Sequence, residues 1–182
     1  MESAMEQLPR FRYHPDPIAT QSIVPREGFT CGVCGEVRSH AYIGPYLADN
    51  FGFENGDEIC PWCIADGRAA RDWNATFVSP FILSDTARPA MPQEALTELE
   101  LRTPSFLCLA QEQWLDHHGE PAAYLGPIGY TEYQGLPPQA QAAVRQCGYS
   151  TEILKNDGDG PTAYLFRCLH CDWHGAFVAF GG

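Results

Sequence analysis

The chain has 182 residues, of which 45% are hydrophobic, and a formal net charge of −12 from 11 Lys and Arg against 23 Asp and Glu. This length can fill one hydrophobic core, so a single compact domain over residues 1–182 is expected. An acidic chain repels phosphate backbones, which disfavours nucleic-acid binding and favours a basic partner, although the charge could equally serve solubility alone. No stretch approaches the ~20 apolar residues that span a bilayer, and a cytoplasmic protein is expected.

The first elements predicted along the chain form a hairpin around a pair of cysteines. Residues 8–17 hold three prolines, so this segment is expected to be extended and not helical. An edge strand is predicted over residues 18–24, and a strand over residues 38–43 returns from the turn that holds Cys31 and Cys34. Because glycines at positions 32 and 35 allow a tight turn, we expect a zinc-knuckle hairpin here.

The strongest motif consists of two Cys-x-x-Cys pairs separated by 25 residues, Cys31–Cys34 and Cys60–Cys63. One pair at this spacing can chelate an ion, and a second pair completes the tetrahedron that structural Zn²⁺ prefers. Pro61 suits the first turn of a helix, which is predicted to continue through residue 70. We therefore predict a structural zinc site at these four cysteines, in a module over residues 28–72.

Three other uses of these cysteines fit the sequence less well. A redox dithiol needs one pair and leaves the other unexplained. Two disulfides suit a secreted protein, yet residues 1–12 lack the charged and apolar regions of a signal peptide. A catalytic zinc needs an open coordination position, which four thiolates close. His40 is a further candidate ligand, but with the tetrahedron complete a surface or supporting role is expected for it.

The middle of the chain predicts short elements in an α+β arrangement. A short or edge strand is expected over residues 73–83, and helical spacing of apolar residues predicts a helix over 93–101. Thr103 followed by Pro104 is typical of a helix start, so a second helix is predicted from there to His118, ended by Gly119. A strand and turn are expected over 122–133, a helix over 138–147 and a plain turn, not a calcium loop, over 156–161.

A second knuckle is predicted at Cys168-Leu-His-Cys171, between strands over residues 162–167 and 175–180, as a hairpin over residues 162–182. No other cysteine pair can complete this site. The best complement is the predicted helix end at His117 and His118, and His170 and His174 are candidates nearer in sequence. The competing interpretation is a reduced, metal-free cysteine pair in a hairpin.

Several stretches together resemble the CbrC family of bacterial proteins, over nearly the whole chain. They are Leu8-Pro-Arg-Phe-Arg-Tyr-His-Pro-Asp-Pro17, Cys60-Pro-Trp-Cys-Ile-Ala-Asp-Gly67, Arg102-Thr-Pro104 with Trp114, and Tyr164-Leu-Phe-Arg-Cys168 through Cys171. That family includes a colicin-tolerance member, and some members look like immunity proteins of toxin systems. Its pattern has His-Cys where this chain has His117-His118, so the resemblance implies His118 as the third ligand. The fourth ligand is then expected from His117, His170 or His174, or the position is unfilled. The chain departs from the pattern over residues 105–110 and 177–182.

The resemblance and the charge together imply a zinc-binding immunity or tolerance protein that neutralises a basic toxin, such as a nuclease. Candidate contact residues are acidic: Asp49, Glu54, Asp57 and Glu58, with residues 112–120 as a second patch. The alternatives are a metal-dependent or redox enzyme that uses the C-terminal Cys/His cluster, and a zinc adaptor in regulation. Against an enzyme, the sequence lacks HExxH and a phosphate-binding glycine loop.

Overall fold

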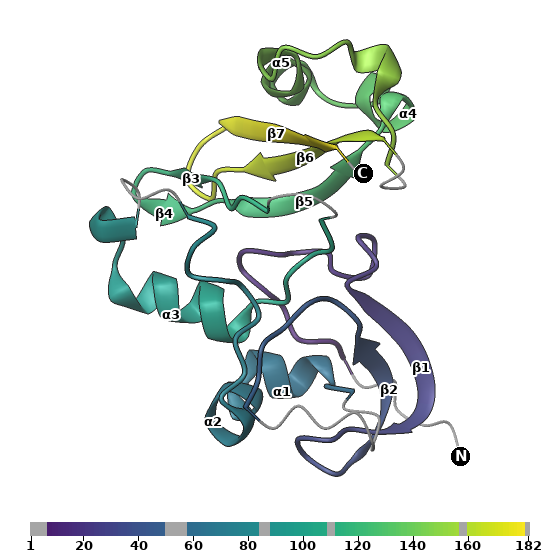
Figure 1. Ribbon diagram of the computed structural model, residues 1–182, viewed down its shortest axis with the longest axis vertical. Helices are drawn as coiled ribbons and strands as arrows, with labels where there is room; N and C mark the ends of the chain where they lie inside the picture. Colours follow the sequence, from purple (N-terminus) through teal and green to yellow (C-terminus); the bar gives the residue numbers. More distant parts are fainter. Residues whose placement is uncertain (1–6, 50–57, 84–87, 109–111, 157–159, 181–182) are drawn as a thin grey trace.

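The computed structural model describes residues 7–49, 58–83, 88–108, 112–156 and 160–180, and its fold is α+β, as expected (Figure 1). Short helices are combined with three small antiparallel sheets. The elements in order are β1 (Ile23–Thr30), β2 (Val37–Tyr42), α1 (Pro61–Ala65), α2 (Arg68–Trp73), the 3-10 helix η1 (Arg88–Ala90), α3 (Gln93–Arg102), β3 (Asp116–His117), β4 (Glu120–Pro121), β5 (Ala123–Ile128), α4 (Tyr130–Gln134), α5 (Pro138–Gln146), the 3-10 helix η2 (Thr151–Ile153), β6 (Pro161–Arg167) and β7 (His174–Phe180). None of the helices in these described ranges has the length and apolarity needed to cross a membrane.

The N-terminal half consists of the β1–β2 hairpin and the helices α1 and α2. Antiparallel pairing runs from Ile23 opposite Tyr42 to Thr30 opposite Val37, so the first cysteine pair lies in the connecting turn. The expected strand over 38–43 is confirmed, whereas the strand expected over 18–24 begins only at Ile23. The helix predicted from Pro61 is divided in two, because Gly67 adopts a φ of 75° between α1 and α2.

The C-terminal half is built on the sheet β5-β6-β7, in which all neighbours are antiparallel. Figure 1 shows α4 and α5 together beyond one side of this sheet and α3 on the other. Ala140, Val144 and Leu165 are buried together, which shows that the apolar face of α5 packs on the sheet. The predicted helices over 93–101 and 138–147 and the two strands of the second knuckle are confirmed.

An aromatic cluster connects α3 to the sheet. Phe106 is 1% exposed and stacks on Tyr124 with a ring-centroid distance of 4.0 Å. Trp114 and Phe166 pack against the same group at 5.6 and 6.2 Å from Phe106. Because such rings bury large apolar areas, this cluster is a major stabilising feature of the molecule.

The helix predicted from Thr103 to His118 is wrong for the described residues. Thr103 donates its hydroxyl proton backward to the carbonyl of Glu98 at 2.9 Å and so caps the end of α3, not the start of a new helix. Residues 104–108 and 112–115 are not helical, and Leu109 and Ala110 lie outside the described residues. The physical reason is tertiary packing: Phe106 and Trp114 enter one aromatic cluster, which outweighs the local start signal.

Two smaller expectations also need correction. The strand predicted over residues 73–83 is absent from this described stretch, where pairing is limited to a single bridge between Thr76 and Leu47. The chain instead turns inward here, and Phe77 and Val78 are buried in two different clusters. The end of the predicted helix is a hairpin, in which β3 pairs with β4 around His118 and Gly119.

Candidate metal centres

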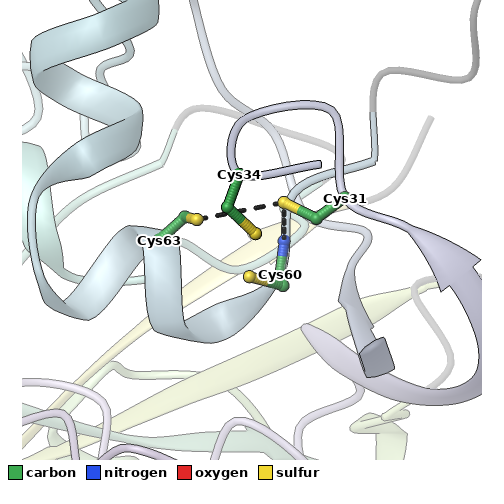
Figure 2. Close-up of side chains that lie close together, drawn as sticks. All are labelled: Cys31, Cys34, Cys60 and Cys63. Carbon is green, nitrogen blue, oxygen red and sulfur yellow. Dashed lines mark hydrogen bonds between the residues drawn. The ribbon is translucent and has the colours of Figure 1, made fainter. Parts of the chain in front are cut away.

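The first candidate site joins the β1–β2 turn to the start of α1. Cys31 and Cys34 come from the turn, and Cys60 and Cys63 come from the first turn of the helix, as Figure 2 shows. The four sulfur atoms all lie within 4.8 Å of one another, and Cys31, Cys60 and Cys63 are fully buried. The Sγ atoms of Cys31 and Cys63 are 3.9 Å apart. In a regular tetrahedron with metal–sulfur bonds of about 2.3 Å, this distance is about 3.8 Å.

Local backbone geometry brings these sulfur atoms together. The N–H of Gly35 donates to the carbonyl of Cys31 at 2.8 Å, and Gly35 has a φ of 70°, which closes the turn. Only glycine fits at position 32, because a Cβ there would lie 2.5 Å from the indole ring of Trp73. Pro61 begins α1 directly after Cys60 and so aims Cys60 and Cys63 at the turn.

Hydrogen bonds in this first site favour one thiolate over the others. Contacts with the Cys60 and Cys63 thiols, and the Cys60 N–H that donates to the Cys31 sulfur at 3.3 Å, lower the pKa of the Cys31 thiol. The same contact with Cys31 raises the pKa of Cys60 to about 12 and raises the pKa of Cys63. All four cysteines could ionise together only with a cation between them, because thiolates this close repel one another.

The second candidate site joins the β3–β4 hairpin to the β6–β7 turn. The ligand atoms of His117, His118, Cys168 and Cys171 all lie within 4.8 Å of one another. Nδ1 of His117 is 3.7 Å from Sγ of Cys171, close to the ~3.6 Å expected between nitrogen and sulfur ligands of a tetrahedral metal. This site is more exposed than the first, because Cys168 is buried but His118 and Cys171 are exposed.

A β-turn explains how two neighbouring histidines can face one ion. His118 and Gly119 have φ values of 57° and 70°, the left-handed pair typical of a two-residue hairpin turn. The rings of His117 and His118 consequently lie close together, with centroids 4.2 Å apart. Trp173 stacks on His117 at 4.5 Å with an interplanar angle of 2° and holds that ring in place. The two histidines therefore face the site from a hairpin and not from the end of the predicted helix.

The other two candidate histidines make different contacts. His170 hydrogen-bonds through Nε2 to the carboxylate of Glu120, and His174 Nδ1 lies 3.0 Å from the carbonyl of Asp172. The backbone N–H of His170 donates to the Cys168 sulfur at 3.3 Å. Burial raises the pKa of Cys168, but this N–H and that of Cys171 outweigh it, so the pKa is lowered overall. Of the three alternatives, His117 is therefore the one placed with the cysteines.

Each of the two groups could hold a metal ion. Their donor sets are four sulfurs, and two sulfurs with two imidazole nitrogens. Comparison with known proteins then places the chain in a family: the model described as "Uncharacterised protein family (UPF0167)" matches residues 8–180. The chain belongs to UPF0167. Two of its relatives have 42% and 34% identity to it, which supports the same assignment.

The first of these relatives is the UPF0167 protein Mb2317 of Mycobacterium bovis, and the alignment covers 98% of this chain and 96% of the relative. The UPF0167 protein PA1536 of Pseudomonas aeruginosa is aligned over 90% of this chain and 92% of its own length. No solved structure matches this chain. The assignment to the CbrC family is corrected by these findings, because the family model and both relatives carry the UPF0167 description.

Two of the four acidic contact residues expected in this UPF0167 chain lie within the described structure, and each has a partner of its own. Asp49 accepts a hydrogen bond from the Asn74 amide at 2.9 Å, and Glu58 pairs with Arg26 at 2.9 Å. Glu54 and Asp57 lie outside the described residues. His40 is 2.9 Å from the hydroxyl of Ser39 and is not part of the cysteine group, in agreement with a supporting or surface role.

Sequence reasoning missed a polar cluster beside the second site. Glu120, on β4, accepts a hydrogen bond from the Tyr13 hydroxyl at 2.9 Å and pairs with Arg12 as well as His170. These contacts lower the pKa of the Glu120 carboxyl although its burial raises it. The cluster joins the N-terminal segment to both loops of the site. No local signal could have revealed it, because Glu120 is separated from each of its partners by 50 residues or more.

Proposed function

We propose that this UPF0167 member is a zinc-stabilised protein whose two metal sites serve structure and whose activity is to bind a basic protein. The observation that carries the proposal is the group of four cysteines, three of them fully buried, with sulfur atoms within 4.8 Å of one another. Four thiolates fill the tetrahedral coordination of Zn²⁺ and leave no position for a substrate. A site of this kind stabilises a fold and does not catalyse.

Zinc is the ion that best suits both donor sets. Thiolate and imidazole ligands in tetrahedral arrangement are those that Zn²⁺ prefers, whereas Mg²⁺ and Ca²⁺ prefer oxygen ligands. The second set, two cysteines and two histidines, is also a closed structural set. In the first site, Cys31, Cys34, Cys60 and Cys63 would hold the ion, and in the second, His117, His118, Cys168 and Cys171.

The support for a basic partner is electrostatic. The formal net charge is −12 before metal binding, and four thiolates with one Zn²⁺ make it more negative by two. Such a field accelerates association with a positively charged protein and disfavours nucleic acids. A toxin with a basic surface, neutralised in the cytoplasm by an immunity protein, is the partner that we propose.

The test is co-expression with the product of the adjacent gene. The proposal requires rescue from toxicity and a stable complex on gel filtration, with an association rate that falls as salt shortens the Debye length to ~10 Å at 0.1 M. A neighbour that is not toxic, or a toxic neighbour that is not neutralised, overturns the toxin proposal. The zinc content is measured separately from the rescue assay. A protein that contains zinc but does not neutralise the toxin would still support the structural role of the metal sites.

A second candidate, a metal-dependent enzyme, is favoured by the exposure of His118 and Cys171. If an exposed ligand dissociates, a zinc ion gains the open position that catalysis needs. Turnover of a small-molecule substrate that is lost in both Cys171→Ala and Cys168→Ala would favour this candidate over the binding protein.

A further inference from the structure

A cleft of about 800 Å³ lies between the N-terminal segment and the sheet, away from both metal sites. It is walled by the turn around residues 19–22, the end of β2, residues 106 and 107, β5 and the start of α4. None of the eight candidate metal ligands lines it. Its volume falls within the range of about 300–1,000 Å³ that is typical of small-molecule sites.

One wall of the cleft is apolar, and its rings are held in place by the aromatic cluster. Phe106 and Tyr124, which stack at 4.0 Å, both line it and belong to the main aromatic cluster. Leu107 and Ile43 stand at its edge with exposed fractions of 69% and 55%. Gly126, with a φ of 130°, lies beside Thr20, and an added Cβ would be in ordinary contact with the Thr20 methyl at 3.4 Å. An apolar ligand would find a rigid surface here.

A buried histidine determines how the hydroxyl of Thr20 can act in this cleft. His14 is fully buried, with Nδ1 2.7 Å from the Pro104 carbonyl and Nε2 2.7 Å from the Thr20 hydroxyl. A carbonyl can only accept, so Nδ1 carries the proton and Nε2 must accept from Thr20. Burial keeps His14 neutral by lowering its pKa to about 4. Because the Thr20 hydroxyl donates its proton to His14, its oxygen can only accept, either from the Ser22 hydroxyl at 3.5 Å or from a ligand in the cleft.

The charge of the cleft comes from Glu132. Among the residues that the structure describes, it is the carboxylate in the lining, and no Lys or Arg lines the cleft. Its two oxygens accept from Asn156 at 2.7 Å and from the Gly129 N–H at 3.0 Å, which fixes the carboxylate and leaves lone pairs on each oxygen. The nearby Lys155 packs its stem against Gly160.

We propose that this cleft binds a small organic cation, an amine carried on a flat apolar body. The exposed aliphatic side chains of Leu107 and Ile43 receive the body above the buried ring pair, and the fixed Glu132 carboxylate with the Thr20 oxygen accepts hydrogen bonds from the ammonium group. An anion would face the carboxylate without a compensating positive charge. This binding site goes beyond the proposed association with a basic protein and does not depend on it.

The experiment compares three ligands with one indole body: tryptamine, which is a cation, tryptophol, which is neutral, and indole-3-propionate, which is an anion. Titration of zinc-loaded, ¹⁵N-labelled protein should shift the amide signals of Gly44, Leu107 and Gly126. We expect tryptamine to bind about 10-fold or more tightly than tryptophol, because a hydrogen bond to a charged partner is roughly twice as strong as a neutral one. Indole-3-propionate should bind most weakly.

Two variants test separately how the charge and the apolar wall contribute to ligand affinity. Glu132→Gln should bring the tryptamine affinity to within about 2-fold of that for tryptophol, and Leu107→Ala should weaken both ligands alike. Val37→Ala is the matched control, since Val37 is also 69% exposed but does not line the cleft. Equal affinities for the three ligands in the parent protein, or signal shifts outside the cleft, would overturn the proposal. Binding of an arginine-containing tetrapeptide as tightly as tryptamine would also overturn it, because the ligand would then be a basic peptide and not a small amine.

Discussion

Replacing Cys60 by serine should remove the metal of the first site and destabilise the whole N-terminal half. Cys60 is fully buried, and the hydrophobic cluster around it includes Ile59, Ile64 and Phe77. A serine hydroxyl has nearly the same size as a thiol but does not ionise at neutral pH and binds zinc poorly. The three remaining cysteines would stay crowded around a position that has lost one of its four anionic ligands.

The expected magnitude follows from the coupling between metal binding and folding. Structural zinc contributes about 10–16 kcal/mol in small zinc-finger peptides at neutral pH, whereas a whole domain is stable by about 5–15 kcal/mol. Loss of even half of the smaller figure, about 5 kcal/mol, would lower the Tm by about 10–20 °C for a chain of this size. Cys60→Ser is thus expected to melt at much lower temperature or to unfold at 37 °C.

Cys147→Ser provides the matched control. The Cys147 thiol lies outside both metal groups and donates to the carbonyls of Ala176 at 3.3 Å and Ala143 at 3.6 Å, which a serine hydroxyl can also do. Its cost should be less than about 1 kcal/mol. Metal content is measured by elemental analysis of protein purified without added metal, and Tm by calorimetry with and without chelator. A parent protein that contains no zinc, or a Cys60→Ser protein that is as stable as the parent, would refute the reasoning.

Three further predictions address the second site, the buried histidine and the aromatic cluster. His118→Ala should reduce zinc from two to one per chain by elemental analysis, whereas His174→Ala should retain two. His14 is buried neutral with a pKa of about 4 against 6.5 when unfolded, so the unfolded state binds more protons between these values. Acidification from pH 7 to 4 should therefore cost the parent about 3 kcal/mol more than His14→Asn in denaturant unfolding. Phe106→Ala should cost about 3–5 kcal/mol by the same method and the exposed Leu107→Ala less than about 0.5 kcal/mol.

The sequence alone predicted those features that depend on residues close together in the chain. The chelating pairs Cys31–Cys34 and Cys60–Cys63 could be recognised because two cysteines three positions apart already form half of a tetrahedral site. The helix α3 and the strands β6 and β7 followed from periodicity, since each buries one face or one run of apolar residues. These features needed no knowledge of distant contacts.

Only the tertiary structure decided which histidines meet the second cysteine pair. His117 and Cys171 are 54 positions apart, and they meet because the β3–β4 hairpin lies beside the β6–β7 turn. The misleading helix signal at Thr103 failed for the same physical reason, since burying Phe106 and Trp114 in one cluster is worth more than a local cap. The cleft that holds Glu132 likewise arises from packing between segments far apart in the chain, for which spacing carries no signal.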